Sequence, residues 1–329
     1  MKKIFIGLLL VTFFSMGMFQ KNVKAEEMEN QNEAIAEIVT DIESVTLPYD
    51  NELVKVGQDR IINYLISKGI DAEVASIDYT KELQKIQEDL LLSDELVLDY
   101  ISHYLSEVAE IQLVDGSNQS EVDSVNSKLI SQSFSEKRNQ NVEAIKELAE
   151  RNQVSTPLNR TAKKPLRSLN VKKATDYALR FANGNNGVDY PIFASDCTNF
   201  ASQIAKAGGI QSSNSYKNYS GSYWHPSALS RNKAWYNAQA FFNFFNAEGM
   251  RTYGAGNKSE VNKYGEAGDM LCYIRRSSGA VDHVAYVNRK TNGKVYISQH
   301  SVNRRDKKFD DIDVFSQFSY VFVLKFRYW

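Results

Sequence analysis

One of the two cysteines in this 329-residue chain lies where a helix is expected to begin. Cys197 follows Ser195 and Asp196 and precedes an apolar stripe at helical spacing, which stops at Gly208 and Gly209. The unpaired N–H groups and the positive dipole end of a helix N-terminus favour a thiolate, the nucleophilic form of cysteine. The carboxylate of Asp196 opposes this effect unless helix capping engages its charge. The position predicts a cysteine nucleophile.

A base for this cysteine is expected on a β-hairpin near the C-terminus. Asn292-Gly293 has the composition of a two-residue hairpin turn, which would pair Val287 with Ser298 along the two strands. In that register His283 and His300 share one face as diagonal neighbours, with roughly 7–8 Å between their backbones. A shift of the register by one residue would turn His300 away from His283.

Together these residues predict a nucleophile, a base and a polar group that orients the base, in the chain order Cys197, His283, His300. Two other roles remain open. Cys197 could form a disulfide with Cys272, as is common in exported proteins, or it could hold zinc with the two histidines and the preceding aspartate. Cys272 lies in the apolar run Met270–Ile274, where a free buried cysteine is common, and the zinc ligands lack a short-spaced pair. We therefore expect no disulfide, no metal and no other cofactor.

The elements that must position these residues divide the chain into two parts of opposite charge. Between Glu26 and Arg160 there are 28 acidic and 11 basic residues, whereas Thr161–Trp329 holds 12 acidic and 24 basic residues. Residues 26–152 carry apolar stripes at helical spacing and predict an all-α domain. Residues 153–170 are a basic linker with two prolines, and residues 171–329 are a second domain. In this second domain helix patterns precede strand patterns, which predicts the α+β class with an antiparallel sheet.

The first 25 residues have the pattern of a cleaved secretory signal. Lys2 and Lys3 precede an apolar run that is short for a membrane span, and Val23-Lys24-Ala25 supplies small residues for cleavage. We expect a secreted protein with no stable membrane anchor.

The basic half of the chain is expected to bind an anionic wall polymer rather than nucleic acid, and the run Arg304–Lys308 is expected to be a solvated turn. The acidic half could cover the basic half until a protease cuts the linker.

Several short motifs in the second half resemble those of one hydrolase family. They are Asp196-Cys197-Thr198-Asn199-Phe200, Gly268-Asp269-Met270, Asp282-His283-Val284 and Ser298-Gln299-His300-Ser301. Over about residues 171–303 the chain is similar to the putative amidase domain family, a branch of the papain-like cysteine hydrolases near the NlpC and CHAP peptidases. The resemblance implies a papain-like fold, with Cys197 as nucleophile, His283 as base, His300 as orienting group and the backbone N–H of Cys197 as an oxyanion donor. By resemblance to NlpC enzymes, where a tyrosine serves, Tyr190 is the nearest candidate for a second oxyanion donor, and a packing role is favoured over it.

Aromatic residues near these motifs are candidates for substrate contact or for the core. Tyr223 and Trp224 lie in a loop rich in Gly and Ser, where the pattern fits a groove and a packed core equally well. With Tyr190 and Asp196 they are the expected substrate-binding residues. The sequence thus predicts a secreted cysteine amidohydrolase that forms an acyl-enzyme, with cell-wall peptidoglycan peptides as substrate. The alternative is a secreted protein that keeps the fold and binds the cell wall or another surface without turnover.

Overall fold

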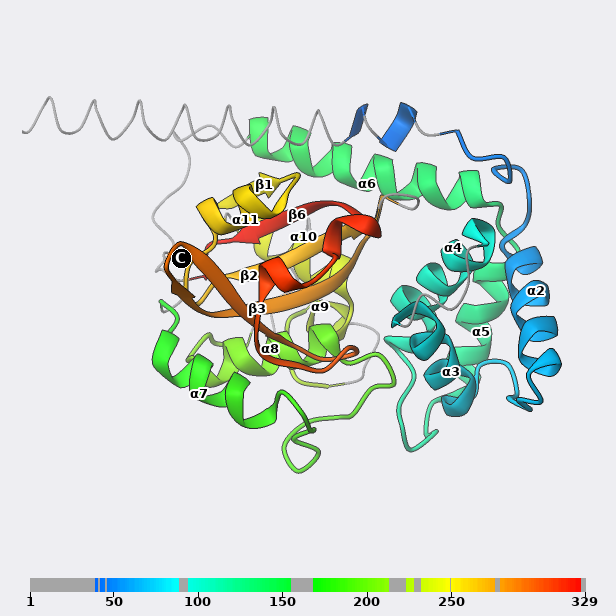
Figure 1. Ribbon diagram of the computed structural model, residues 1–329, viewed down its shortest axis with the longest axis horizontal. Coiled ribbons are helices and arrows are strands. Elements are labelled where there is room, and N and C mark those ends of the chain that lie inside the picture. The colour runs from blue at the N-terminus through cyan, green and yellow to red at the C-terminus, as the bar shows by residue number, and fades with distance from the viewer. Residues whose placement is uncertain are drawn as a thin grey trace, which may run out of the picture.

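The computed structural model describes residues 39–40, 42–44, 46–88, 94–154, 168–212, 223–227, 232–248, 250–275 and 279–326 (Figure 1). The expected signal segment and most of the expected linker lie outside the described residues. The N-terminal half is helical, and the C-terminal half combines helices with an antiparallel sheet. The predicted α+β class, with helices before the sheet, is therefore confirmed. No helix within these ranges is both long and apolar enough to cross a membrane.

The helical half is built from amphipathic segments. Its elements are α2 (Val54–Ser67), α3 (Ile77–Glu88), α4 (Glu95–Tyr104), the π-helical turn η1 (Leu105–Ala109), α5 (Gln119–Ile130) and α6 (Phe134–Val154). Asp94 caps α4 by accepting the backbone N–H of Val97, and the helix buries Tyr100 and Tyr104 on one stripe. The turn η1 continues α4 directly, and Glu110 follows it with a fully buried side chain. Such π-helical turns are frequent at functional sites.

The C-terminal half contains one six-stranded sheet in the order β1-β6-β2-β3-β4-β5, with neighbouring strands antiparallel. Its helices are α7 (Val171–Phe181), α8 (Cys197–Ala207), α9 (Lys233–Tyr236), α10 (Ala238–Ala247) and α11 (Lys258–Tyr264), with the 3-10 turns η4 (Phe309–Asp311) and η5 (Val314–Ser316). Its strands are β1 (Thr252–Ala255), β2 (Met270–Arg275), β3 (Val281–Thr291), β4 (Lys294–Gln299), β5 (Arg304–Lys308) and β6 (Phe318–Leu324).

The two faces of this sheet are covered by different elements. On β2, Met270 and Cys272 point to the face covered by α7, α8 and α10, whereas Leu271 and Tyr273 point to the face covered by α11, η4 and η5. The first of these two cores also includes the apolar stripes of the helical half. In Figure 1, α6 extends from the helical bundle along the sheet, where it contacts α10.

The helical half holds the loop that leads into α8. An antiparallel β-bridge joins Leu113 to Phe193, and the backbone N–H of Ala194 donates to the carbonyl of Gln112 at 2.9 Å. The next N–H, that of Ser195, donates to the carbonyl of Ala109 at 3.2 Å. The position of Cys197 therefore depends on contacts from both halves of the chain.

The hairpin of β3 and β4 turns at Asn292 and Gly293, as predicted, and both residues have positive φ, 52° and 72°. The predicted register beyond the turn is wrong. A bulge between Val287 and Arg289 shifts the pairing by one residue, so that Val287 lies opposite Ile297 rather than Ser298. His300, just after β4, consequently faces α8.

The basic run Arg304–Lys308 is strand β5 rather than the expected solvated turn. It covers the free edge of β4, with Arg304 opposite Gln299, and an ion pair between Arg289 and Asp306 ties it to β3. Its side chains alternate, so that Arg304 is partly buried while Arg305 is exposed.

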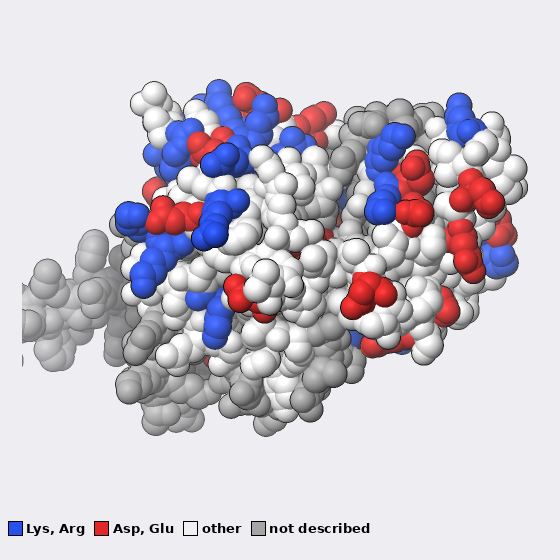
Figure 2. Space-filling model, turned by 90° about the horizontal axis from the view of Figure 1, so that it is seen from below, with Lys and Arg blue, Asp and Glu red and all other residues white. Residues whose placement is uncertain are grey.

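The surface reflects the charge division of the sequence. In the view of Figure 2, acidic side chains predominate on the helical half, and most of the basic side chains gather on the half that contains the sheet.

Candidate active site

Cys197 is the first residue of α8, and its side chain is buried. Its Sγ lies 3.6 Å from Thr198 Oγ1 and 3.8 Å from Glu110 Oε1. Burial and the negative charge of Glu110 raise the pKa of the thiol, while a hydrogen bond with the backbone of Val284 acts in the opposite direction. The helix N-terminus therefore does not produce the lowered thiol pKa that the sequence position indicates. Asp196 occupies the N-cap position, but its carboxylate makes no capping bond.

Glu110 was not recognised from the sequence. Its carboxylate accepts the side-chain amide of Asn237 at 2.8 Å, the backbone N–H of Ala238 at 3.2 Å and the hydroxyl of Thr198 at 3.4 Å. Burial raises its pKa well above the usual range. Glu110 comes from the helical half, far from Cys197 in sequence. The one local signal is an acidic residue within the apolar run Val108–Ile111.

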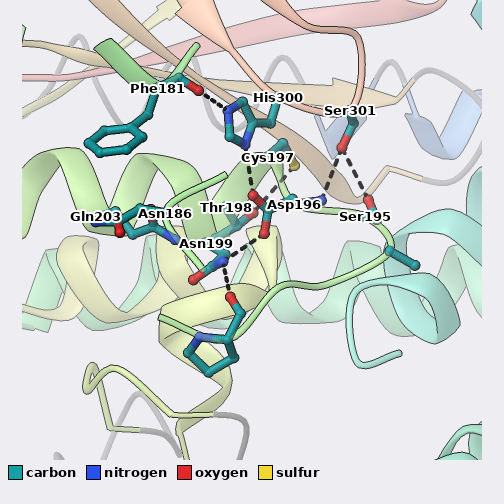
Figure 3. Close-up of polar contacts among 12 residues, drawn as sticks. Phe181, Asn186, Ser195, Asp196, Cys197, Thr198, Asn199, Gln203, His300 and Ser301 are labelled. Atoms are coloured by element: carbon teal, nitrogen blue, oxygen red, sulfur yellow. Dashed lines mark hydrogen bonds and ion pairs between the residues drawn. The ribbon is translucent and has the colours of Figure 1, made fainter. Parts of the chain in front are cut away.

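His300 lies in a fully bonded network (Figure 3). Its Nδ1 lies 2.7 Å from Asp196 Oδ2, its Nε2 lies 2.8 Å from the carbonyl oxygen of Phe181, and its ring stacks on Phe200 with 3.7 Å between centroids. The second oxygen of Asp196 accepts the side-chain amide of Asn199 at 2.6 Å. A carbonyl and a carboxylate only accept, so both hydrogen bonds exist together when each ring nitrogen carries a hydrogen. His300 thus fixes the end of α7 and the start of α8, and the structure does not bring it to His283.

His283 belongs to a row of polar side chains that crosses four neighbouring strands. The row consists of Tyr273 on β2, His283 on β3, Gln299 on β4 and Arg304 on β5. Tyr273 pairs with His283, with ring centroids 5.0 Å apart, and Gln299 pairs with Arg304. Each of the four has one buried atom without a partner in standard hydrogen-bond geometry: the Tyr273 hydroxyl, His283 Nε2, Gln299 Oε1 and Arg304 Nε. The side chains of His283 and Gln299 nonetheless interact, which opposes the effect of burial on the pKa of His283.

Burial also sets the protonation state of His283. It lowers the pKa of the imidazole to about 4, while the negative charge of Asp282 acts in the opposite direction. At neutral pH the ring is therefore uncharged and can accept a proton. His283 Nε2 makes no hydrogen bond to the thiol of Cys197. The thiol instead interacts with the backbone of Val284, the next residue along β3.

The polar row lines a cleft of about 210 Å³ between the sheet and the helical half. Gln84, Ser102 and Ser106 of the helical half form the opposite wall, and Ser195 lies at the edge. Within the cleft Arg275 pairs with Asp282, which also accepts the hydroxyl of Ser102 at 2.9 Å. Both halves of the chain therefore shape the cleft.

The four expected substrate-binding residues do not line this cleft. Trp224 is fully buried, donates from its indole N–H to Ser202 Oγ at 2.9 Å and packs against Trp235, so it belongs to the core. Tyr190 is partly buried and stacks on Trp235. Tyr223 is partly buried, and Asp196 is engaged by His300. Their contact with substrate stays a prediction.

The Gly268-Asp269 motif supports the sheet. Gly268 has a φ of 100°, a left-handed conformation that favours glycine, in the turn before β2. Asp269 is fully buried, where its carboxylate pairs with Lys325 and accepts the backbone N–H of Glu266 at 2.8 Å. Burial raises the pKa of Asp269 to about 6.

Both cysteines are free. Among the residues with described positions, no group of three or more His, Cys, Asp or Glu side chains could hold a metal ion.

Comparisons with known proteins address the C-terminal half. Residues 168–323 match the family model described as "Putative amidase domain". A segment of 144 residues, 41% of this chain, is 31% identical to a Bacillus subtilis (strain 168) protein named "Uncharacterized protein YjcM", of which it covers 30%. No solved structure matches the chain. The match includes Cys197, His283 and His300, and it agrees with the family that the motifs predict.

Proposed function

We propose that the chain hydrolyses amide bonds at the cleft that the polar row lines, with Cys197 as nucleophile and His283 as base. The observation that carries the proposal is the row of unpartnered polar atoms on β2 to β5. Buried polar groups are nearly always hydrogen-bonded, and each one without a partner costs about 1–3 kcal/mol. Four such atoms on one wall of a cleft indicate a surface that a polar ligand completes. The family match supplies the class of bond.

In the proposed reaction Cys197 Sγ attacks the carbonyl carbon of the amide, and the thiol proton passes to Nε2 of His283. The backbone N–H of Cys197, at the N-terminus of α8, donates to the developing oxyanion. The C–N bond then breaks, the amine leaves with the proton from His283, and a thioester remains on Cys197. Water attacks this thioester, His283 takes its proton, and the carboxylic acid is released as the thiol regains a proton.

The reaction requires the thiol to leave Glu110 and turn toward the cleft when substrate binds. Catalytic hydrogen bonds often form fully only in the complex with substrate. Sγ lies near the backbone of Val284, whereas the side chain of the preceding residue, His283, lies beside Tyr273 on the other face of the strand, so the imidazole must also turn before the two groups meet. His300 acts in this scheme as a positioning residue, which holds Asp196 and the start of α8.

The proposal has three finer parts. The first is a papain-like arrangement, supported by the packing of the cysteine-bearing helix α8 on the histidine-bearing strand β3. The second is secretion, supported by the signal pattern of residues 1–25. The third is a peptidoglycan peptide as substrate and an anionic wall polymer as surface partner, supported by the basic C-terminal half and the expected export.

A second candidate function is binding to the cell wall without turnover. Cys197 favours it, because the thiol is buried, does not line the cleft and has a raised pKa. In that case the same cleft would bind a wall peptide and release no product.

Amine release from peptidoglycan sacculi and from a panel of fluorogenic amides tests the proposal. We expect Cys197→Ala and His283→Ala to lose at least about 10³-fold in rate, as removal of a nucleophile or its base does in comparable hydrolases. Cys272→Ala is the matched control, because Cys272 is the other buried free cysteine and lies on β2 opposite Val284. Amine release by Cys197→Ala at the wild-type rate contradicts the proposal. Binding to sacculi without product, equal in all variants, favours the second candidate.

A further inference from the structure

We infer that the cleft selects amides that carry a free carboxylate, and that Arg304 binds this carboxylate. The inference rests on the proposed function, because it concerns the substrate class of the same cleft. It assigns a specificity-determining role to a residue on β5 that lies outside the motifs of the family.

Arg304 differs from Arg275, the other arginine of the cleft, and from Arg289 on β3 in forming no ion pair with an acid of the described residues. Arg275 pairs with Asp282, and Arg289 pairs with Asp306. No ion pair joins Arg304 to an acid within the described part of the chain, and its Nε is buried without a hydrogen-bond partner. Keeping a partly desolvated guanidinium without a counter-ion costs free energy. An anionic ligand therefore gains more binding free energy at Arg304 than it would at the exposed surface.

Two acids line the cleft together with Arg304. Asp282 pairs with Arg275, and Asp313 is exposed and forms no ion pair with Arg304. The charge of Arg304 reaches the polar row, since it contributes to the lowered pKa of His283 and opposes the effect of burial on the pKa of Tyr273. The wall that carries the row is therefore positive at its β5 end.

The chemistry of the Arg304 guanidinium and the spacing of the strands indicate which chemical group the ligand carries and how far it lies from the reacting carbonyl. Guanidinium N–H groups form a planar fork that matches the two oxygens of a carboxylate. Neighbouring strands lie about 4.8 Å apart, so β5 is roughly 10 Å from the strand of His283. A carboxylate at about this distance from the reacting carbonyl fits a short peptide, either through its C-terminus or through an acidic side chain. A neutral amide at the same place leaves the charge of Arg304 unpaired.

Binding can be measured without turnover in the Cys197→Ala chain. The probes are N-acetyl-alanyl-alanine, in its L and D forms, and the matching C-terminal amides, titrated by ligand-observed NMR. We expect the free acid to bind about tenfold more tightly than the amide, the change produced by about one charge-assisted hydrogen bond. Arg304→Gln removes this preference, and Arg304→Lys keeps part of it. Arg305→Gln is the matched control, because Arg305 is the exposed neighbour on the same strand and leaves the preference unchanged.

Three results overturn the inference: equal binding of acid and amide, a preference for the acid that survives Arg304→Gln in a folded protein, or no binding of either peptide. Circular dichroism spectra of all variants establish the folded state. Amide hydrolysis by the wild-type chain is measured separately. A retained acid preference without any hydrolysis contradicts the proposed function alone, whereas hydrolysis without an acid preference contradicts the carboxylate inference alone.

Discussion

The two histidines of the amidase motifs lie in environments of opposite kind. Both ring nitrogens of His300 have acceptors, and its ring stacks on Phe200. Nε2 of His283 has no partner, and the same holds for one polar atom on each neighbour in its row. A satisfied network rigidifies a fold, whereas unsatisfied buried groups that gather along one wall of a cleft mark a candidate binding surface. The comparison separates a histidine that positions a helix from one that is available for chemistry.

The largest expected effect concerns stability. His300→Ala removes the imidazole that bonds the buried carboxylate of Asp196 and the ring that stacks on Phe200, so we expect a loss of about 3–5 kcal/mol in the free energy of unfolding. His283→Ala removes the contact with Tyr273 and the interaction with Gln299 but no partner of a buried carboxylate, and its expected cost is about 1 kcal/mol. Urea denaturation followed by circular dichroism measures both. Equal losses of unfolding free energy in the two variants would show that His300 supports the fold no more than His283 does.

A second prediction extends the comparison to Glu110, the satisfied acid beside Cys197. Glu110→Ala leaves Asn237, the N–H of Ala238 and the Thr198 hydroxyl without their acceptor. We expect a loss of about 2–3 kcal/mol in the free energy of unfolding, because buried donors lose their partner. Glu110→Gln keeps an acceptor oxygen and should cost clearly less. Glu121→Ala on the exposed side of α5 is the control and should change stability by less than about 0.5 kcal/mol.

Local patterns were sufficient to predict the elements that carry the site. Cys197 begins a helix that ends at Ala207 with Gly208 as its C-cap, and the strands around His283 and the turn at Asn292-Gly293 follow their expected positions. These features depend on neighbouring residues, through helical spacing, strand alternation and the preference of Asn-Gly for positive φ.

Contacts between distant residues could not be predicted in this way. The side chain of Asn288 donates to Ser298 Oγ at 2.8 Å within the bulge, and this single extra residue reverses the direction of His300. The alternation of apolar residues in β3 carries no sign of it. The contact of Glu110 with Cys197 and the pairing of β5 with β4 likewise depend on the tertiary fold.

A third prediction uses pH to isolate His283. Its pKa is about 4 in the folded chain and near 6.5 when unfolded, so between these values the unfolded state binds more protons. Stability contributed by the neutral ring is therefore present above pH 6.5 and is lost as the pH falls toward 4. From pH 7 to pH 4.5 we expect the wild type to lose about 1–2 kcal/mol more than His283→Gln, a figure reduced for the partial exposure of the ring. Parallel pH profiles of the two proteins would show that His283 is not buried as a neutral base.

The smallest expected effects are the changes in stability caused by removing the hydroxyl groups of two buried tyrosines in the sheet. Tyr273 and Tyr286 are both buried tyrosines of the sheet, yet the Tyr273 hydroxyl has no partner while the Tyr286 hydroxyl lies 3.0 Å from Thr175 Oγ1. Tyr286→Phe should cost about 1 kcal/mol in the free energy of unfolding, the net contribution of one hydrogen bond. Tyr273→Phe should change it by less than about 0.5 kcal/mol, because the substitution removes a desolvated hydroxyl that bonds nothing. If Tyr273→Phe costs as much as Tyr286→Phe, the hydroxyl is bonded in solution. The polar row would then be part of the packing of the sheet, and the cleft would lose the feature that marks it as a binding site.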